Sequence, residues 1–144
     1  MKIDFINNTY IVYLNKYNII NFDFNNTKIL EDNIRNLLIR LKKYYKLGIK
    51  GCYNIVIYID GYYGVILEVS EDDNYYDYFS DTVSLRMKKI KTSFKYEVED
   101  ISDFTTDKFK IIINNRKIYL EIIDSLCEDE YLRLLEMSKI VYDK

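Results

Sequence analysis

Tight-turn signals between runs of alternating apolar and polar residues constrain this chain more than any other feature. Asn7-Asn8 and Asp60-Gly61 each lie between two such runs. Because Asn and Gly tolerate the positive φ that two-residue hairpin loops require, both pairs predict antiparallel hairpins. Four hairpins are predicted along the chain: 2–7 with 9–14, 53–59 with 62–69, 83–90 with 94–99, and 109–113 with 117–123.

Two other segments carry apolar residues at helical spacing. The first helix is predicted over 27–47, with Asn26 or Thr27 as the N-terminal cap and Gly48 at its end. The second is predicted over 125–142, where Ser125 and Glu128 form a capping-box pattern. Its expected apolar side consists of Leu132, Leu135, Met137, Ile140 and Val141. The sequence thus predicts an α+β fold of mostly antiparallel sheet, with two amphipathic helices packed on sheet faces.

The predicted elements divide the chain at an acidic, tyrosine-rich stretch. Residues 1–70 form a predicted ββαββ unit, residues 71–81 a connector, and residues 82–144 hairpins plus the C-terminal helix. A length of 144 residues suits one domain or two very small ones. A single compact domain is therefore equally compatible with the pattern.

Missing residue types exclude several kinds of catalytic site. The chain has no histidine and only four glycines, and none of these forms a GxGxxG or GxxxxGK[ST] motif. Serine or cysteine triads that use histidine, HExxH zinc sites, dinucleotide folds and P-loops are therefore excluded. Acid–base chemistry would need a pair of carboxylates, which spacing along one sequence does not reveal. We expect a protein that is not an enzyme and that uses no cofactor or metal.

The same survey gives an expected location. No apolar run approaches the length of a membrane span, and the first residues lack the pattern of a secretory signal. Cys52 and Cys127 are expected to be two buried thiols rather than a disulfide. We therefore expect a cytoplasmic protein, and the frequent Ile, Asn, Lys and Tyr indicate a low-GC bacterium or phage as its source.

The connector is the main candidate for a protein-binding surface, because exposed aromatic residues are enriched at interfaces and tyrosine loses little entropy on binding. The flanking acids would set the charge of the partner and the association rate. An alternative left open is that the tyrosines fold back onto the core. The candidate residues are Tyr75, Tyr76, Tyr78 and Phe79, with Asp72, Asp73 and Asp77.

A basic run offers a different candidate, a nucleic-acid-binding hairpin. Its cations are Arg86, Lys88, Lys89, Lys91 and Lys95, interleaved with Phe94 and Tyr96. Basic residues and aromatics on strands can follow a nucleic-acid backbone. The alternative is a solvated sheet face whose lysines prevent edge-to-edge aggregation. A net charge of −2 gives no general attraction to nucleic acid, so binding to nucleic acid is expected to be unlikely and secondary.

The order of elements in residues 1–69 resembles the N-terminal domain of MecA-type adaptors, which deliver substrates to a Clp-type protease chaperone. The matching residues are the opening 1–7, a leucine-rich helix, and Gly51 and Gly64 ahead of strands. A weaker match follows later in the chain, at 98–103, Ile118-Tyr119-Leu120 and Leu135-Glu136. The resemblance implies a non-catalytic adaptor that binds substrate with its first half and the chaperone with its second.

A different class of function stays open beside the adaptor. A phage or mobile element could encode such a chain as an inhibitor that blocks a host defence nucleoprotein or sequesters a small ligand. Small size, an acidic balance and AT-rich coding suit that hypothesis. The partner in that case is a nucleoprotein complex rather than a chaperone.

Overall fold

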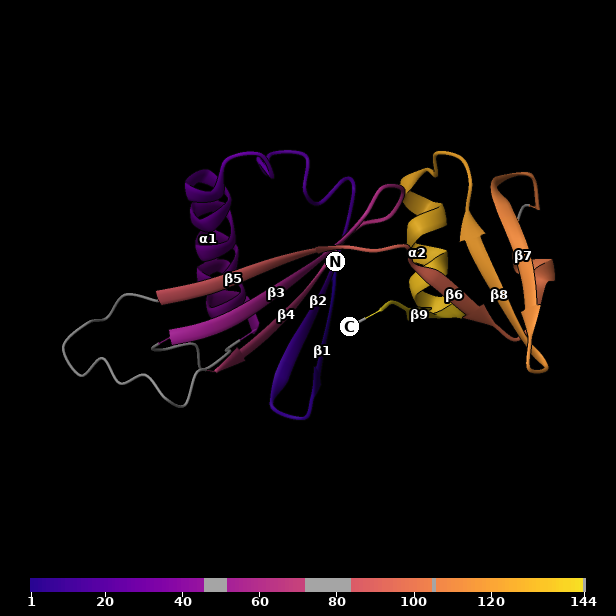
Figure 1. Cartoon of the computed structure of the whole chain (residues 1–144), viewed down its shortest axis with the longest axis horizontal. Helices are drawn as coiled ribbons and strands as arrows, with labels where there is room; N and C mark the ends of the chain where they lie inside the picture. Colours follow the sequence, from indigo (N-terminus) through magenta and orange to yellow (C-terminus); the bar gives the residue numbers. More distant parts are fainter. Residues whose placement is uncertain (46–51, 72–83, 105, 144) are drawn as a thin grey trace.

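A computed structural model describes residues 1–45, 52–71, 84–104 and 106–143, which form an α+β fold of mostly antiparallel sheet (Figure 1). The elements are β1 (Lys2–Ile6), β2 (Thr9–Asn15), α1 (Thr27–Tyr45), β3 (Cys52–Asp60), β4 (Gly64–Glu71), β5 (Ser84–Lys91), β6 (Lys95–Val98), the 3-10 turns η1 (Ile101–Asp103) and η2 (Thr106–Lys108), β7 (Phe109–Asn114), β8 (Lys117–Ile122), α2 (Glu128–Met137) and β9 (Ser138–Val141).

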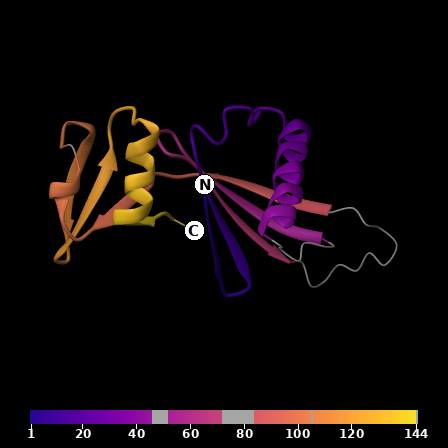
Figure 2. The same cartoon turned by 180° about the vertical axis from the view of Figure 1, so that it is seen from behind.

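These strands form two sheets. The first has the order β1-β2-β4-β3-β5 and is antiparallel except that β5 runs parallel to β3. The second has the order β7-β8-β6-β9 and is antiparallel throughout. The two sheets follow one another along the long axis of the molecule, with α1 beside the first sheet and α2 on the side of the second sheet that is nearer to the first (Figures 1 and 2).

Two predicted hairpin turns are confirmed by their backbone geometry. Asn7 and Asn8 have φ of 51° and 58°, and Asn115 and Arg116 have φ of 51° and 66°. Paired positive φ values match the right-handed twist of the flanking strands, which explains why asparagine occupies these turns.

The third predicted turn forms between the expected strands but is longer than a two-residue loop. Asp60 pairs with Gly64, so residues 61–63 make the turn. The Asp60 carboxylate accepts hydrogen bonds from the backbone N–H groups of Tyr62 and Tyr63, both at 2.8 Å. Gly64, not Gly61, takes the positive φ, at 133°.

The predicted hairpin between 83–90 and 94–99 is wrong. β5 pairs with β3, from Cys52↔Ser84 to Ile59↔Lys91, whereas β6 lies in the second sheet between β8 and β9. The chain between them crosses from one sheet to the other, where Asp60 accepts a hydrogen bond from the Phe94 N–H at 2.9 Å. Phe94, Tyr96 and Val98 are buried in a core that a local hairpin would not provide, and burial of large apolar side chains outweighs short-range turn preference.

Helix α1 covers one face of the first sheet. The Asn26 side chain accepts a hydrogen bond from the Ile29 N–H at 3.2 Å and caps the helix as predicted. The predicted end at Gly48 lies outside the described residues. Buried residues of α1 share one cluster with alternate residues of β2, β3 and β4, namely Leu30, Ile34, Leu37, Leu38 and Leu41 with Val12, Leu14, Ile55, Ile57, Val65, Leu67 and Val69 among others.

The second predicted helix is wrong at both ends. α2 covers Glu128–Met137, and the Cys127 N–H donates to Glu130 at 3.0 Å in place of the predicted Ser125–Glu128 capping pair. Residues 138–141 form β9, which pairs with β6. Tyr131 and Leu134 are the buried residues of α2. Of the predicted apolar side, Leu135 and Ile140 pack partly buried against the same core, whereas Leu132 and Met137 are exposed. β-Branched Ile140 and Val141 suit the extended pairing better than a last helical turn.

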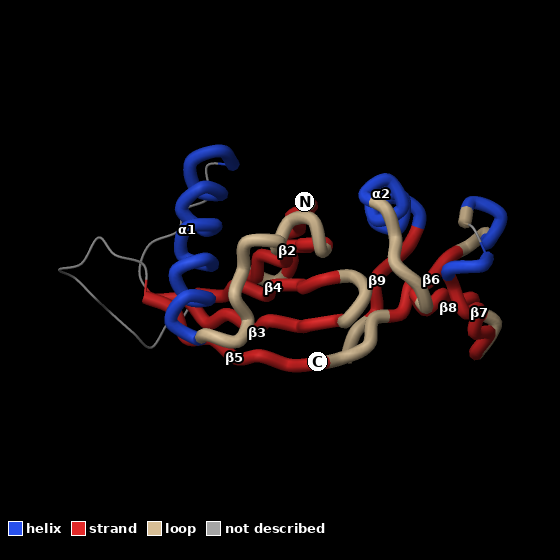
Figure 3. The backbone as a smooth tube through the Cα atoms, turned by 90° about the horizontal axis from the view of Figure 1, so that it is seen from above, coloured by secondary structure: helices blue, strands red, loops and turns tan. Residues whose placement is uncertain are grey.

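A second core joins the two sheets. It combines Ile11, Tyr58 and Ile66 from the first sheet with residues of β6, β7, β8 and α2. Tyr131 is buried in this core. The centroid of its ring lies 5.6 Å from that of Tyr63, and its hydroxyl donates a hydrogen bond to the Tyr62 carbonyl at 2.5 Å. Seen from above, α2 lies beside the end of the first sheet at which β3 turns into β4 (Figure 3).

Two further expectations can be compared with this structure. Cys127 is a free and exposed thiol, so the expectation of a buried thiol is wrong at this position, because it begins α2 at the surface. Across the described ranges, no helix combines the length and apolar character needed to cross a membrane.

Candidate functional site

The residues predicted to bind protein, Asp72, Asp73, Tyr75, Tyr76, Asp77, Tyr78 and Phe79, lie outside the described residues. The two flanks of this segment are described. Glu71 at the end of β4 pairs with Tyr53, and Ser84 at the start of β5 pairs with Cys52. Both flanks therefore lie at one end of the first sheet, where β3 begins.

The predicted basic residues do not form one hairpin. Arg86, Lys88, Lys89 and Lys91 are exposed on β5, whereas Lys95 is exposed on β6 of the other sheet. Their alternation is as predicted, since Leu85 and Met87 pack against the core beneath α1 and the residues between them point away from it. Phe94 and Tyr96 are 2% and 0% exposed, so their rings are inaccessible to nucleic-acid bases.

Edge strand β1 exposes two consecutive large apolar side chains. Phe5 is 59% exposed and Ile6 is 53% exposed. Phe5 pairs with Tyr10 on the face that carries α1, and Ile6, as the next residue, points to the other face. β1 pairs with β2 on one side. Its other edge therefore presents backbone donors and acceptors between two exposed apolar side chains.

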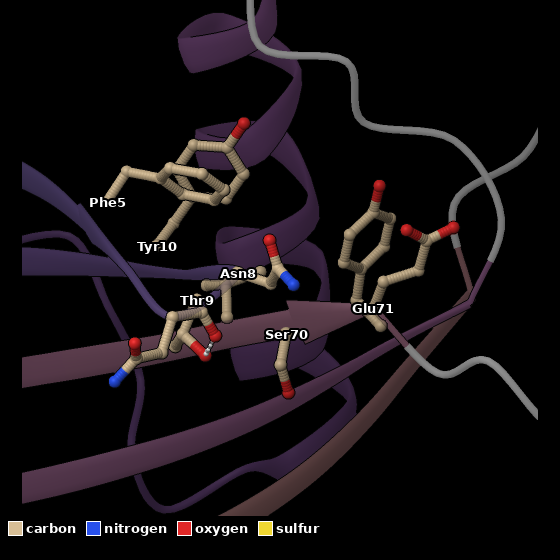
Figure 4. A pocket seen from close by; sticks show the side chains of 9 residues that line it. Phe5, Asn8, Thr9, Tyr10, Ser70 and Glu71 are labelled. Atoms are coloured by element: carbon tan, nitrogen blue, oxygen red, sulfur yellow. Dashed lines mark hydrogen bonds between the residues drawn. The ribbon is translucent and has the colours of Figure 1, made fainter.

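A hollow of about 510 Å³ lies beside Phe5 at the end of the first sheet where β1 turns into β2, and it extends to the ends of β3 and β4 (Figure 4). Phe5 and Tyr10 form one wall, with ring centroids 4.6 Å apart. Asn8, Ser70 and Glu71 supply polar groups around it. The hollow thus offers an aromatic wall and hydrogen-bonding groups that can accept a side chain of mixed character.

A second hollow of about 460 Å³ lies on the opposite face, between β1–β2 and the segment from α2 to β9. Lys2, Asp4 and Ile6 line it from β1, and residues 138–142 line it from the other side. The Lys2 ammonium lies 3.8 Å from the Asp4 carboxylate and 5.4 Å from the centroid of the Tyr13 ring. Burial, followed by the nearby Asp4 carboxylate, raises the pKa of Tyr13 to about 12, so Tyr13 is a neutral hydrogen-bonding group at physiological pH.

A tyrosine–carboxylate group anchors the C-terminal segment beside this second hollow. The Tyr142 hydroxyl donates to one Glu68 oxygen at 2.7 Å, and the Tyr58 hydroxyl donates to the other at 3.4 Å. The ring centroids of Tyr58 and Tyr142 lie 4.7 Å apart. Burial and the hydrogen bond to Glu68 raise the pKa of Tyr142 well above its ordinary value. These phenols therefore stay protonated and hold β9 against the first sheet.

Together these features describe an edge suited to an extended polypeptide. Side chains of a strand laid along β1 would alternate between the two hollows, while its backbone pairs with that of β1. The sequence pattern missed this site because hairpin signals do not say which strand lies at the edge of a sheet. The available signal was the pair Phe5-Ile6, since two consecutive apolar residues in a strand cannot both face the same core.

Comparison of this chain with protein families, with curated proteins and with solved structures finds no match.

Proposed function

We propose that this chain is a non-catalytic, cytoplasmic adaptor or regulatory protein that binds another protein by adding an extended segment of that partner to β1. The observation that carries the proposal is the exposure of Phe5 and Ile6 on opposite faces of an edge strand. Exposed apolar edges are avoided in proteins that do not use them, because they recruit other strands.

The other edge strands of the described sheets are less suited to this role. β5 carries four cations in eight residues, and β9 is only four residues long. β7 exposes Ile111 at 39% and Ile113 at 73%, but residues two apart lie on the same face of a strand. β1 therefore has the better geometry for gripping alternate side chains of a partner.

A narrower form of the proposal follows the resemblance to MecA-type adaptors. The opening residues that carry the resemblance, 1–7, include all of β1. A Clp-type chaperone and the unfolded segments that such a chaperone receives are therefore the first partners to test. The nucleoprotein inhibitor has no comparable observation in its favour.

The experiment measures binding of immobilised, unstructured ten-residue peptides of alternating polarity and of a purified Clp-type chaperone by biolayer interferometry. In the variant Phe5→Lys/Ile6→Lys we expect peptide affinity to fall at least about tenfold, since burying either side chain contributes roughly 1.5–3 kcal/mol. Ile20→Lys/Ile113→Lys is the matched control, because both isoleucines are more than 70% exposed, at 77% and 73%, and lie elsewhere. The control should bind as the wild type does.

The proposal would be contradicted if the control variant lost peptide binding while the Phe5→Lys/Ile6→Lys variant bound as the wild type does. The binding site would then lie on another surface. Equal affinity for peptides methylated at every backbone nitrogen would also contradict the proposal, because these peptides have no N–H donors to offer to a strand edge. Chaperone binding decides only the narrower form of the proposal, whereas peptide binding decides strand addition.

A further inference from the structure

The opposite edge of the first sheet has a different chemistry. β5, Ser84–Lys91, contains four cations and no acid, in a chain whose net charge is −2. Among the described residues it is an edge strand, because its pairing within the sheet is with β3. Charge of one sign is thus concentrated along a strand that has no second neighbour in the described part of the chain.

The residues of β3 directly opposite the three lysines of β5 are uncharged. Lys88, Lys89 and Lys91 pair with Val56, Ile57 and Ile59. Lys89 donates to the Phe24 carbonyl at 3.3 Å, which is a neutral acceptor. Strand β3 therefore contributes no opposite charge to these lysines, and the positive field of β5 extends toward the outer edge of the sheet.

The cations project from both faces of the strand. Arg86 and Lys88 lie on the face away from α1, while Lys89 and Lys91 alternate onto the other. A strand paired with β5 would send its own side chains to the same two faces, each opposite a β5 side chain. Carboxylates on both faces of that strand would then find a cation.

We propose that β5 pairs with an acidic extended polypeptide segment, so that the first sheet holds two different partners at its opposite edges. Opposite charges directly across a strand pair are stabilising, and like charges are destabilising. The same lysines that repel basic strands and copies of β5 therefore select an acidic strand.

The observations favour a polypeptide over nucleic acid as this partner. The aromatic residues that follow β5, Phe94 and Tyr96, are buried and cannot stack on bases. Lys95 belongs to the other sheet, so the cations end with β5. A polypeptide, unlike a nucleic acid, also uses the backbone donors and acceptors of the strand edge.

The test is an NMR titration of the ¹⁵N-labelled chain at low ionic strength with an acetylated, amidated peptide of the repeat Glu-Glu-Val-Val, eight residues long like β5. Paired glutamates place carboxylates on both faces of an extended strand. We expect amide shifts concentrated in residues 84–91 and a loss of affinity when salt is added. Lys88→Gln/Lys91→Gln should weaken the interaction about fivefold, as two exposed charge pairs would. Lys16→Gln/Lys110→Gln makes the same change in charge on other exposed residues and should bind as the wild type does.

Three results would overturn the proposal: no shifts in β5 at about 1 mM peptide, equal weakening by both variants, or equal binding of a peptide methylated at every backbone nitrogen. Tighter binding of an oligothymidine of similar length, lost in Lys88→Gln/Lys91→Gln, would assign the strand to nucleic acid instead. The β1 variant Phe5→Lys/Ile6→Lys should bind the acidic peptide as the wild type does. The experiment on β5 can therefore contradict this inference without contradicting the proposed function, and the reverse also holds.

Discussion

Replacing Gly64 with alanine tests the packing at the point where β4 begins beside the end of β2. Gly64 has a φ of 133° and pairs with Asn15. A Cβ at this position would meet the backbone of β2, at the Leu14 carbonyl oxygen, at 2.8 Å from the Asn15 carbonyl carbon and at 3.0 Å from the Lys16 nitrogen. Both the backbone conformation and the space around it are therefore specific for glycine.

The cost follows from these two effects. A side-chain-bearing residue in this region of φ costs about 1–3 kcal/mol, and overpacking against a backbone that cannot move costs a similar amount. The backbone here is held in place because Asn15 is 2% exposed and its side-chain oxygen accepts the Tyr17 N–H at 2.9 Å. We expect Gly64→Ala to lower the free energy of unfolding by about 4 kcal/mol, a large part of the 5–15 kcal/mol typical of a domain.

Equilibrium urea unfolding monitored by circular dichroism measures this change. With a slope of about 2 kcal/mol per M, the midpoint should fall by about 2 M. Gly61→Ala in the same turn is the control, because no atom lies within 4 Å of its added Cβ and its φ is not positive. That variant should stay within about 1 kcal/mol of the wild type. Equal midpoints for the two variants would refute the reasoning.

Two other predictions concern carboxylates that accept backbone hydrogen bonds. Asp60→Ala should lower the free energy of unfolding by about 2–4 kcal/mol in urea denaturation, because it removes the acceptor for the Phe94 N–H and for the N–H groups of the turn. Asp60→Asn keeps an acceptor oxygen and should lose less stability. Equal losses in the two variants would contradict the role of Asp60 as a hydrogen-bond acceptor. Hydrogen bonds from Cys127 and Lys108 lower the pKa of Glu130 to about 2. Since the folded pKa lies below the unfolded one, this stabilisation is present above about pH 4.5 and is lost as pH falls toward 2. Glu130→Gln should flatten stability in that range, and an unchanged pH profile would exclude the effect.

Local features of the sequence predicted much of the secondary structure. The asparagine turns at Asn7-Asn8 and Asn115, the cap at Asn26 and most of α1 each depend on residues close together in the chain. Turn and cap geometry is set by φ preferences and by side chains that reach two or three residues. Such features can be recognised without knowing what packs against them.

Tertiary packing decided the elements that the sequence pattern misplaced. Residues 95–98 and 138–141 pair as strands in the second sheet, where Tyr96 lies opposite Ile140. The short-range signals had predicted a hairpin for the first segment and a helix for the second. Burial of Tyr96 in a core shared by distant segments contributes more free energy than a local turn or helix propensity.

The candidate sites divide in the same way. The sequence by itself determined the alternation of apolar residues and cations from Leu85 to Lys88, and it placed Phe5 and Ile6 on opposite faces of their strand. Both follow because successive side chains of a strand must point to opposite faces. Only the tertiary structure decided that β1 and β5 are the two edges of one sheet and that hollows flank β1. The order of strands depends on which apolar faces pack together over long sequence separations, and no local pattern encodes that order.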